Sequence, residues 1–123
     1  MEILAARLLL HPADMERSLG FYRDVLGLAV AREFPGGTVF FLGGGYLELS
    51  GVRRGTPAGE TVGVWLQVRD LDAAHRELVA HVVREPRLEP WGLHEMWLDD
   101  PDGTRIVMVE VPADHPIRRD PRW

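Results

Sequence analysis

The chain has 123 residues, a formal net charge of −5 and no cysteine, and its length suits one compact domain. Its 14 basic residues, all arginine, are outnumbered by 19 acidic ones; this argues against nucleic-acid binding, which usually needs a basic surplus. The lack of cysteine excludes disulfides, thiolate nucleophiles and metal sites held by thiolates. Because no apolar run approaches the roughly 20 residues of a membrane span and the N-terminus does not resemble a signal peptide, we expect a cytoplasmic protein without membrane contact.

The first half of the chain predicts a strand, a helix and three further strands. Residues 3–10 suit a strand, and the Asp14 carboxylate can cap the helix that follows. Apolar residues then recur at helical spacing up to Gly27, a suitable residue for the end of a helix. Three short strands separated by glycine-rich turns are predicted at residues 28–34, 38–42 and 46–50.

The second half repeats this order. Residues 61–68 predict a strand, and Asp70 can cap a second amphipathic helix. A short strand at 82–85 is limited by Pro86, which cannot donate to a sheet. Two further strands joined by a strong turn signal, DDPDG, are predicted at residues 94–98 and 104–111.

This repeat predicts an α+β protein built from two βαβββ modules, which together form one structural domain. A stretch of glycine, threonine and proline indicates a linker between the modules, and a proline-containing tail follows the second one. The predicted boundaries are 1–52 for the first module, 53–60 for the linker, 61–111 for the second module and 112–123 for a C-terminal arm.

Alternating side chains along the predicted strands fall into two faces. The face expected under the helices is wholly apolar and comprises Leu8, Leu10, Leu47, Leu49, Val62, Val64, Leu66, Val68, Met96, Leu98, Ile106 and Met108. The other face mixes charges, an amide and large aromatics, a composition that suits a half-apolar ligand cleft better than a core or a fully wet surface. The predicted ligand-binding residues on this face and its adjoining loop are Arg7, Tyr46, Glu48, Trp65, Gln67, Trp91, Glu95, Trp97 and Arg105.

Several of these residues have a second interpretation. Arg7 and Glu48 could form a buried ion pair, hold the polar part of a ligand, or do both. Trp65 and Trp97 could fill space between the sheets or a dimer interface rather than stack on a flat ligand. Trp91 could simply cover the edge of its sheet.

Three segments are similar to parts of one known family. The run DMERSLGFYRDVLGL at residues 14–28 resembles its first helix, and VRDLDAA at 68–74 resembles the start of its second helix. Trp91-Gly92 followed by DPDGT at 100–104 resembles its closing hairpin. The family is the vicinal oxygen chelate superfamily, with glyoxalase I, bleomycin-resistance proteins, fosfomycin-resistance enzymes and extradiol dioxygenases. The resemblance covers residues 3–111 and implies paired βαβββ modules whose curved sheets enclose a cleft.

The resemblance also implies where a metal would be held in metal-using members. Those places fall on Arg7, Glu48, Gly63 and Val107, of which only Glu48 has a ligating side chain. Because transition metals usually take three or four protein ligands, we predict no metal and no cofactor. An assembly of His11 or His94 with Glu48 in space is left open, as is the question of which of Phe40 and Phe41 faces the cleft.

The resemblance and the residues together lead to one functional hypothesis and two rivals. The first is metal-independent sequestration of an aromatic, antibiotic-like small molecule in a homodimer, as in bleomycin-resistance proteins. The positions of Trp97 and Trp91 resemble those of pocket aromatic residues in fosfomycin-resistance and bleomycin-resistance proteins, respectively. The main rival is an enzyme of the same superfamily, of lyase, isomerase or dioxygenase type, although the missing metal ligands argue against it. The second rival hypothesis is a ligand-sensing accessory module.

Overall fold

The computed structural model describes residues 1–2, 4–5, 7–51 and 62–116, so the predicted linker and the last part of the predicted arm lie outside the described residues. The chain forms two compact units, Met1–Gly59 and Glu60–Trp123, each with its own four-stranded sheet. No helix in the described part of the chain is long and apolar enough to cross a membrane.

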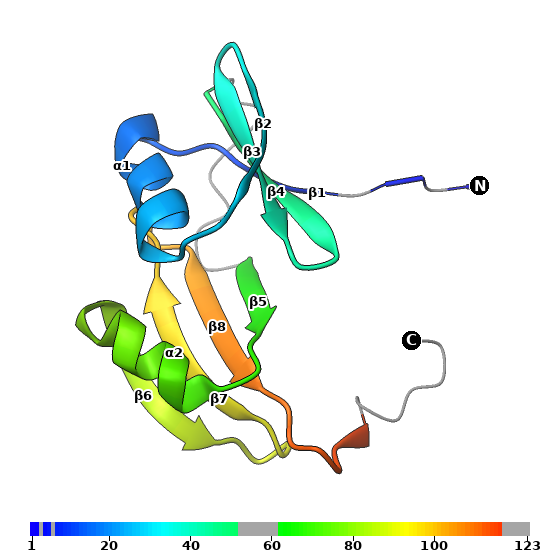
Figure 1. Ribbon diagram of the computed structural model, residues 1–123, viewed down its shortest axis with the longest axis vertical. Coiled ribbons are helices and arrows are strands. Elements are labelled where there is room, and N and C mark those ends of the chain that lie inside the picture. The colour runs from blue at the N-terminus through cyan, green and yellow to red at the C-terminus, as the bar shows by residue number, and fades with distance from the viewer. Residues whose placement is uncertain (3, 6, 52–61, 117–123) are drawn as a thin grey trace. The chain divides into compact units, whose positions relative to one another are not determined.

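The first unit is a mixed sheet with helical segments against one face (Figure 1). Its elements are β1 (Arg7–Leu10), α1 (Met15–Leu19), the π-helical segment η1 (Gly20–Val25), β2 (Val30–Phe34), β3 (Gly37–Leu42) and β4 (Gly45–Ser50). The strands lie in the order β1-β4-β3-β2, with β1 parallel to β4 and the other neighbours antiparallel.

The second unit has the same topology. Its elements are β5 (Gly63–Gln67), α2 (Leu71–Leu78), the 3₁₀ segment η3 (Val79–His81), β6 (Val82–Leu88), β7 (His94–Asp99) and β8 (Arg105–Glu110). The order is β5-β8-β7-β6, again with a parallel first pair, and α2 contacts β6, β7 and β8. The chain is therefore an α+β protein of two βαβββ modules, as predicted.

Both helices begin where the sequence predicts. Asp14 Oδ1 accepts from the backbone N–H of Arg17 at 3.1 Å, and Asp70 Oδ1 accepts from that of Ala73 at 3.0 Å. Each carboxylate thus satisfies an amide that the first helical turn leaves unpaired. The first helix continues as η1 and is followed by Gly27, whose φ of +70° is unstrained only for glycine.

Two strands differ in length from the prediction. β1 spans Arg7–Leu10 and pairs with Tyr46–Leu49 of β4. Residues 4 and 5 of the predicted strand are not in a strand, and residues 3 and 6 lie outside the described residues. β6 extends to Leu88 through Pro86, beyond the predicted end at residue 85. Pro86 is tolerated because β6 is an edge strand whose register shifts between Arg84 and Arg87, so no ladder hydrogen bond is needed there.

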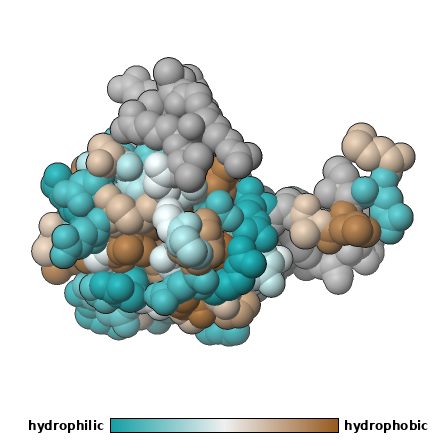
Figure 2. All heavy atoms as spheres, turned by 90° about the horizontal axis from the view of Figure 1, so that it is seen from above, coloured by the Kyte–Doolittle hydropathy of each residue, from teal (hydrophilic) through white to brown (hydrophobic). Residues whose placement is uncertain are grey.

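The predicted apolar face forms the core of each module. In the first module Leu10, Leu47 and Leu49 are buried. In the second module the buried members of the same face are Val64, Met96, Leu98, Ile106 and Met108. Val62 is an exception, because it precedes β5 and is 39% exposed. On the surface, hydrophilic and apolar residues are interspersed over the face seen in Figure 2.

Candidate functional site

The first sheet has a face turned away from its helical segments. Phe40 lies on the helical side, since its fully buried ring is 6.5 Å from that of Tyr22 in η1. Strand alternation places its neighbour Phe41 on the opposite face, where it is 49% exposed. Strand register arranges this opposite face, called here the open face of the first module, in two rows: Arg7, Tyr46 and Phe41, and Leu9, Glu48, Val39 and Arg32.

An ion pair occupies the middle of this open face. Arg7 Nη1 donates to Glu48 Oε1 at 2.7 Å, and the Glu48 side chain is only 16% exposed. The Arg7 guanidinium also lies 5.9 Å from the centre of the Tyr46 ring. Arg7 and Glu48 occupy two of the places where the resemblance implies metal ligands. A guanidinium on the carboxylate competes with a cation for the same oxygen, so these residues do not suit a divalent metal.

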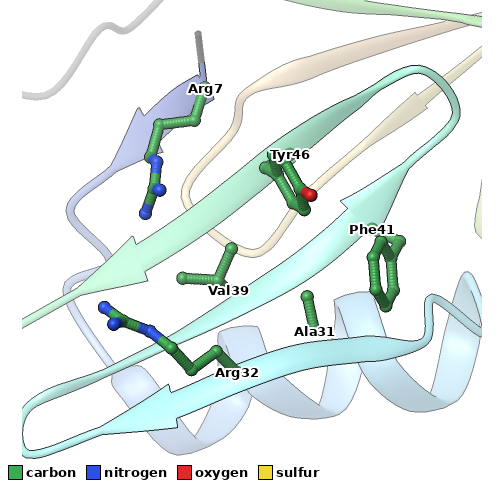
Figure 3. Close-up of a pocket in the computed structure, with 6 residues that line it drawn as sticks. All are labelled: Arg7, Ala31, Arg32, Val39, Phe41 and Tyr46. Atoms are coloured by element: carbon green, nitrogen blue, oxygen red, sulfur yellow. The ribbon is translucent and has the colours of Figure 1, made fainter. Parts of the chain in front are cut away.

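The open face holds a pocket of about 350 Å³. In Figure 3 the guanidinium groups of Arg7 and Arg32 lie toward one end, and the Tyr46 and Phe41 rings lie toward the other. The two rings are 5.7 Å apart at a tilt of 38°, so they form a continuous aromatic wall. The full lining is Arg7, Ala31, Arg32, Val39, Phe41 and Tyr46.

A bulge in β2 brings Arg32 to this pocket. Val30 pairs with Phe40, but Arg32 pairs with Val39, so one extra residue, Ala31, is inserted between them. Regular alternation would put Arg32 on the same face as Val30 and Phe40, the helical side. The inserted residue reverses the faces and turns Arg32 into the pocket.

The corresponding face of the second sheet, called the open face of the second module, has a tryptophan between two arginines. Register places Trp65, Val107, Trp97 and Arg84 in one row across it. The guanidinium of Arg84 lies 4.0 Å from the centre of the Trp97 ring, and that of Arg105 lies 4.5 Å from it. Arg105 Nε in turn donates to Asp99 Oδ1 at 2.6 Å.

Some donors in this cluster are buried and unpaired. Within the described part of the chain, Nε and Nη1 of Arg84 and Nε1 of Trp97 have no hydrogen-bond partner. The Arg84 guanidinium nevertheless lies over the Trp97 ring, a cation–π contact that favours its charge.

A buried carboxylate anchors the arginines at the edge of this sheet. Glu89, which is 4% exposed, forms ion pairs with Arg84 and Arg87. Burial raises the pKa of Glu89, but the hydrogen bonds and charges of the two arginines outweigh it, so its pKa lies below the usual value. Arg84 also donates to the carbonyl oxygen of Glu95 at 3.1 Å.

The remaining predicted residues of the second module divide into two groups. Trp91 Nε1 donates to Glu95 Oε2 at 2.7 Å, so the two side chains are hydrogen-bonded to each other. Glu95 is buried, with 5% of its surface exposed. Trp65, 48% exposed, and Gln67, also exposed, face outward on the same side of the sheet as Trp97.

The structure thus brings Arg7, Tyr46 and Glu48 together in one module and Trp97 and Arg105 together in the other. Sequence reasoning missed further residues of these faces, for different reasons. Phe41 was one of two alternatives, and the core position of Phe40 now decides between them. Arg32 and Arg84 were missed because bulges in β2 and β6 carry no signal in residue type. In the described part of the chain, no group of three or more histidine, aspartate or glutamate side chains could hold a metal ion.

The chain repeats one βαβββ module twice, and each copy has an open sheet face. This arrangement defines a class of small α+β proteins. A family model described as the Glyoxalase/Bleomycin resistance protein/Dioxygenase superfamily matches residues 5–108. The chain belongs to this superfamily, in agreement with the resemblance seen in its motifs. No curated protein sequence matches it significantly.

Solved structures share the fold. A glyoxalase/bleomycin resistance protein/dioxygenase from Nocardioides is 22% identical with a TM-score of 0.75, over 94% of this chain and 89% of that one. A superfamily member from Sphaerobacter thermophilus is 25% identical with a TM-score of 0.72, over 89% and 98% of the two chains. A lactoylglutathione lyase from Agrobacterium tumefaciens is 22% identical with a TM-score of 0.67, over 89% and 96%.

Proposed function

We propose that this protein binds and sequesters a flat aromatic, antibiotic-like small molecule without using a metal and without changing it chemically. The observation that carries the proposal is the pocket of the first module, where an aromatic wall adjoins the ion pair between Arg7 and Glu48. Ligand pockets typically combine apolar and aromatic walls with a few placed polar groups, which is the composition of this pocket.

The binding energy would come mainly from the aromatic wall. A planar ligand over Phe41 and Tyr46 would remove two half-exposed rings from water and stack on their faces. Arg7 and Glu48 hold each other in place, so they present fixed polar atoms to a ligand at little further cost in side-chain entropy.

The open face of the second module also carries large aromatic side chains. Trp65 exposes half of its surface there, and Trp97 lies in the same row with a guanidinium on each neighbouring strand. We also propose that the protein acts as a homodimer, in line with its exposed aromatic side chains; the test of this is argued in the Discussion.

Calorimetric titration with two planar probes, 2-naphthamide and 2-naphthoate, tests the binding function. Replacement of Phe41 by alanine removes half of the aromatic wall, and we expect roughly tenfold weaker binding of whichever probe binds. Val30→Ala is the matched control, because Val30 is also an exposed apolar side chain of this sheet but lies on the face opposite to the pocket.

Two results would contradict the proposal. One is that neither probe binds, or that Phe41→Ala binds as well as the unaltered protein. The other is a chemically altered probe after incubation, detected by mass spectrometry, which would favour an enzyme of the superfamily over sequestration.

A further inference from the structure

Each module carries an arginine at the same structural position. Arg32 in β2 and Arg84 in β6 both follow a break in strand register, and they pair with Val39 and Trp97 of the neighbouring strands. β2 and β6 are also equivalent edge strands of their sheets. In both modules, therefore, a bulge turns an edge-strand arginine onto the open face.

The two arginines differ in how their charge is balanced. Arg84 forms an ion pair with Glu89, and the low pKa of that carboxyl keeps it ionised beside the guanidinium. Arg32 has no carboxylate partner among residues 1–2, 4–5, 7–51 and 62–116, and its side chain rests 5.4 Å above the Phe34 ring. The first module thus has the arginine of this arrangement without its acid.

Neighbouring carboxylates do not supply the missing charge. Glu33 follows Arg32 in the strand, so its side chain points to the opposite face, where its charge acts on Arg23. Glu48 lies in the same row of the open face as Arg32, but its carboxylate is engaged by Arg7. The pocket end is consequently positive, on a chain whose net charge is −5.

We propose that the ligand of this pocket is a planar aromatic molecule that carries a carboxylate. Its oxygens would pair with Arg32 as Glu89 pairs with Arg84, and its rings would lie against Phe41 and Tyr46 at the other end of the pocket (Figure 3). Arginine suits this role because its forked N–H groups match the geometry of a carboxylate. The inference rests on the proposed binding function and adds the charge of the ligand to it.

The experiment compares 2-naphthoate with 2-naphthamide, which share the ring system and differ in charge. For the unaltered protein at low salt we expect naphthoate to bind roughly tenfold more tightly, the usual scale of a hydrogen bond to a charged group. Arg32→Gln should abolish this preference, because it should weaken naphthoate binding much more than naphthamide binding. Added salt should reduce the preference in the unaltered protein, because Arg32 is exposed.

Arg17→Gln is the matched control. It removes the same charge from an exposed arginine of α1 that does not line the pocket, and we expect it to keep the preference. An equal loss of preference in both variants would overturn the proposal, because net charge alone would then explain it. Equal binding of the two probes by the unaltered protein would overturn the carboxylate inference and leave the binding function standing. Failure of both probes to bind would contradict the binding function itself.

Discussion

Glu89 shows how a single carboxylate can organise a sheet edge. It is buried, yet it stays charged because Arg84 and Arg87 both reach it. Arg84 is in turn held over the Trp97 ring, so the position of an aromatic residue on the open face depends on an acid in the loop after β6. Such a buried network stabilises the fold only when every charged group keeps its partner, because an unpaired buried charge is costly.

The low pKa of Glu89 makes part of the stability depend on pH. Because the folded-state pKa lies below the unfolded value, the ion pairs stabilise the fold above the usual glutamate pKa of about 4.3. That contribution is lost as the pH falls through the lowered folded-state value. We expect Glu89→Gln to be less stable than the unaltered protein near pH 7 and the difference to shrink as the pH falls below the usual glutamate pKa, as measured by urea unfolding.

Asp24 provides the control for this prediction. Its pKa is also lowered, chiefly by the hydrogen bond from Arg23, but both side chains are more than half exposed. Solvent screens such a pair, so Asp24→Asn should leave the urea midpoint almost unchanged at either pH. A pH-independent deficit in Glu89→Gln would show that the ion pairs do not act through the charge of this carboxyl.

At the scale of elements, the sequence predicted what depends on local chemistry. The caps at Asp14 and Asp70 were predictable because a side chain and an amide three residues apart decide them. The alternation of Leu47, Glu48 and Leu49 was predictable because strand geometry has a period of two. The bulge at Ala31 was not, because any small residue can be the inserted one and only the partner strand reveals the change of register.

Gly37 in β3 illustrates a further requirement that pairing imposes. A Cβ atom there would overlap the Phe34 ring and would lie 2.6 Å from the carbonyl oxygen of Leu49. The ring can move, but the paired backbone of β4 cannot move without breaking its hydrogen bonds. We expect Gly37→Ala to lower the free energy of unfolding by about 1–3 kcal/mol, the usual cost of overpacking.

Thermal unfolding of two alanine variants tests this. Gly44 lies in the turn between β3 and β4, where an added Cβ would meet nothing within 4 Å. Gly44→Ala should therefore melt close to the unaltered protein, whereas Gly37→Ala should melt several degrees lower. Equal melting temperatures for the two variants would mean that the strands adjust around the new methyl group.

At the scale of the whole molecule, duplication explains why the modules share a design and differ in chemistry. The equivalent rows are Arg32, Val39, Glu48 and Leu9 in one module, and Arg84, Trp97, Val107 and Trp65 in the other. The sequence could assign most of these residues to one face. It could not show that Arg84 has an internal acid partner and that Arg32 has none in the described chain, because partners such as Glu89 lie in loops outside the strand pattern.

The proposed homodimer gives the last prediction. Trp65 and Trp91 expose about half of their side chains on the second module, an amount of apolar surface that association would remove from water. Light scattering coupled to size exclusion should then report twice the chain mass of 13.9 kDa. Trp65→Glu places a charge on that surface and should shift the population toward monomer, since an unpaired carboxylate is costly to bury.

Val79→Glu is the comparison that separates an interface effect from a general one. Val79 is 56% exposed in η3, at the end of α2 and away from the open face, so the same charge there should leave the dimer intact. A monomer mass for the unaltered protein, or equal dissociation of both variants, would contradict an interface at the open face of the second module. Dissociation of Trp65→Glu alone, with an unchanged melting temperature at low concentration, would place the tryptophan at the contact between subunits. A folding defect would instead lower both the melting temperature and the fraction of dimer.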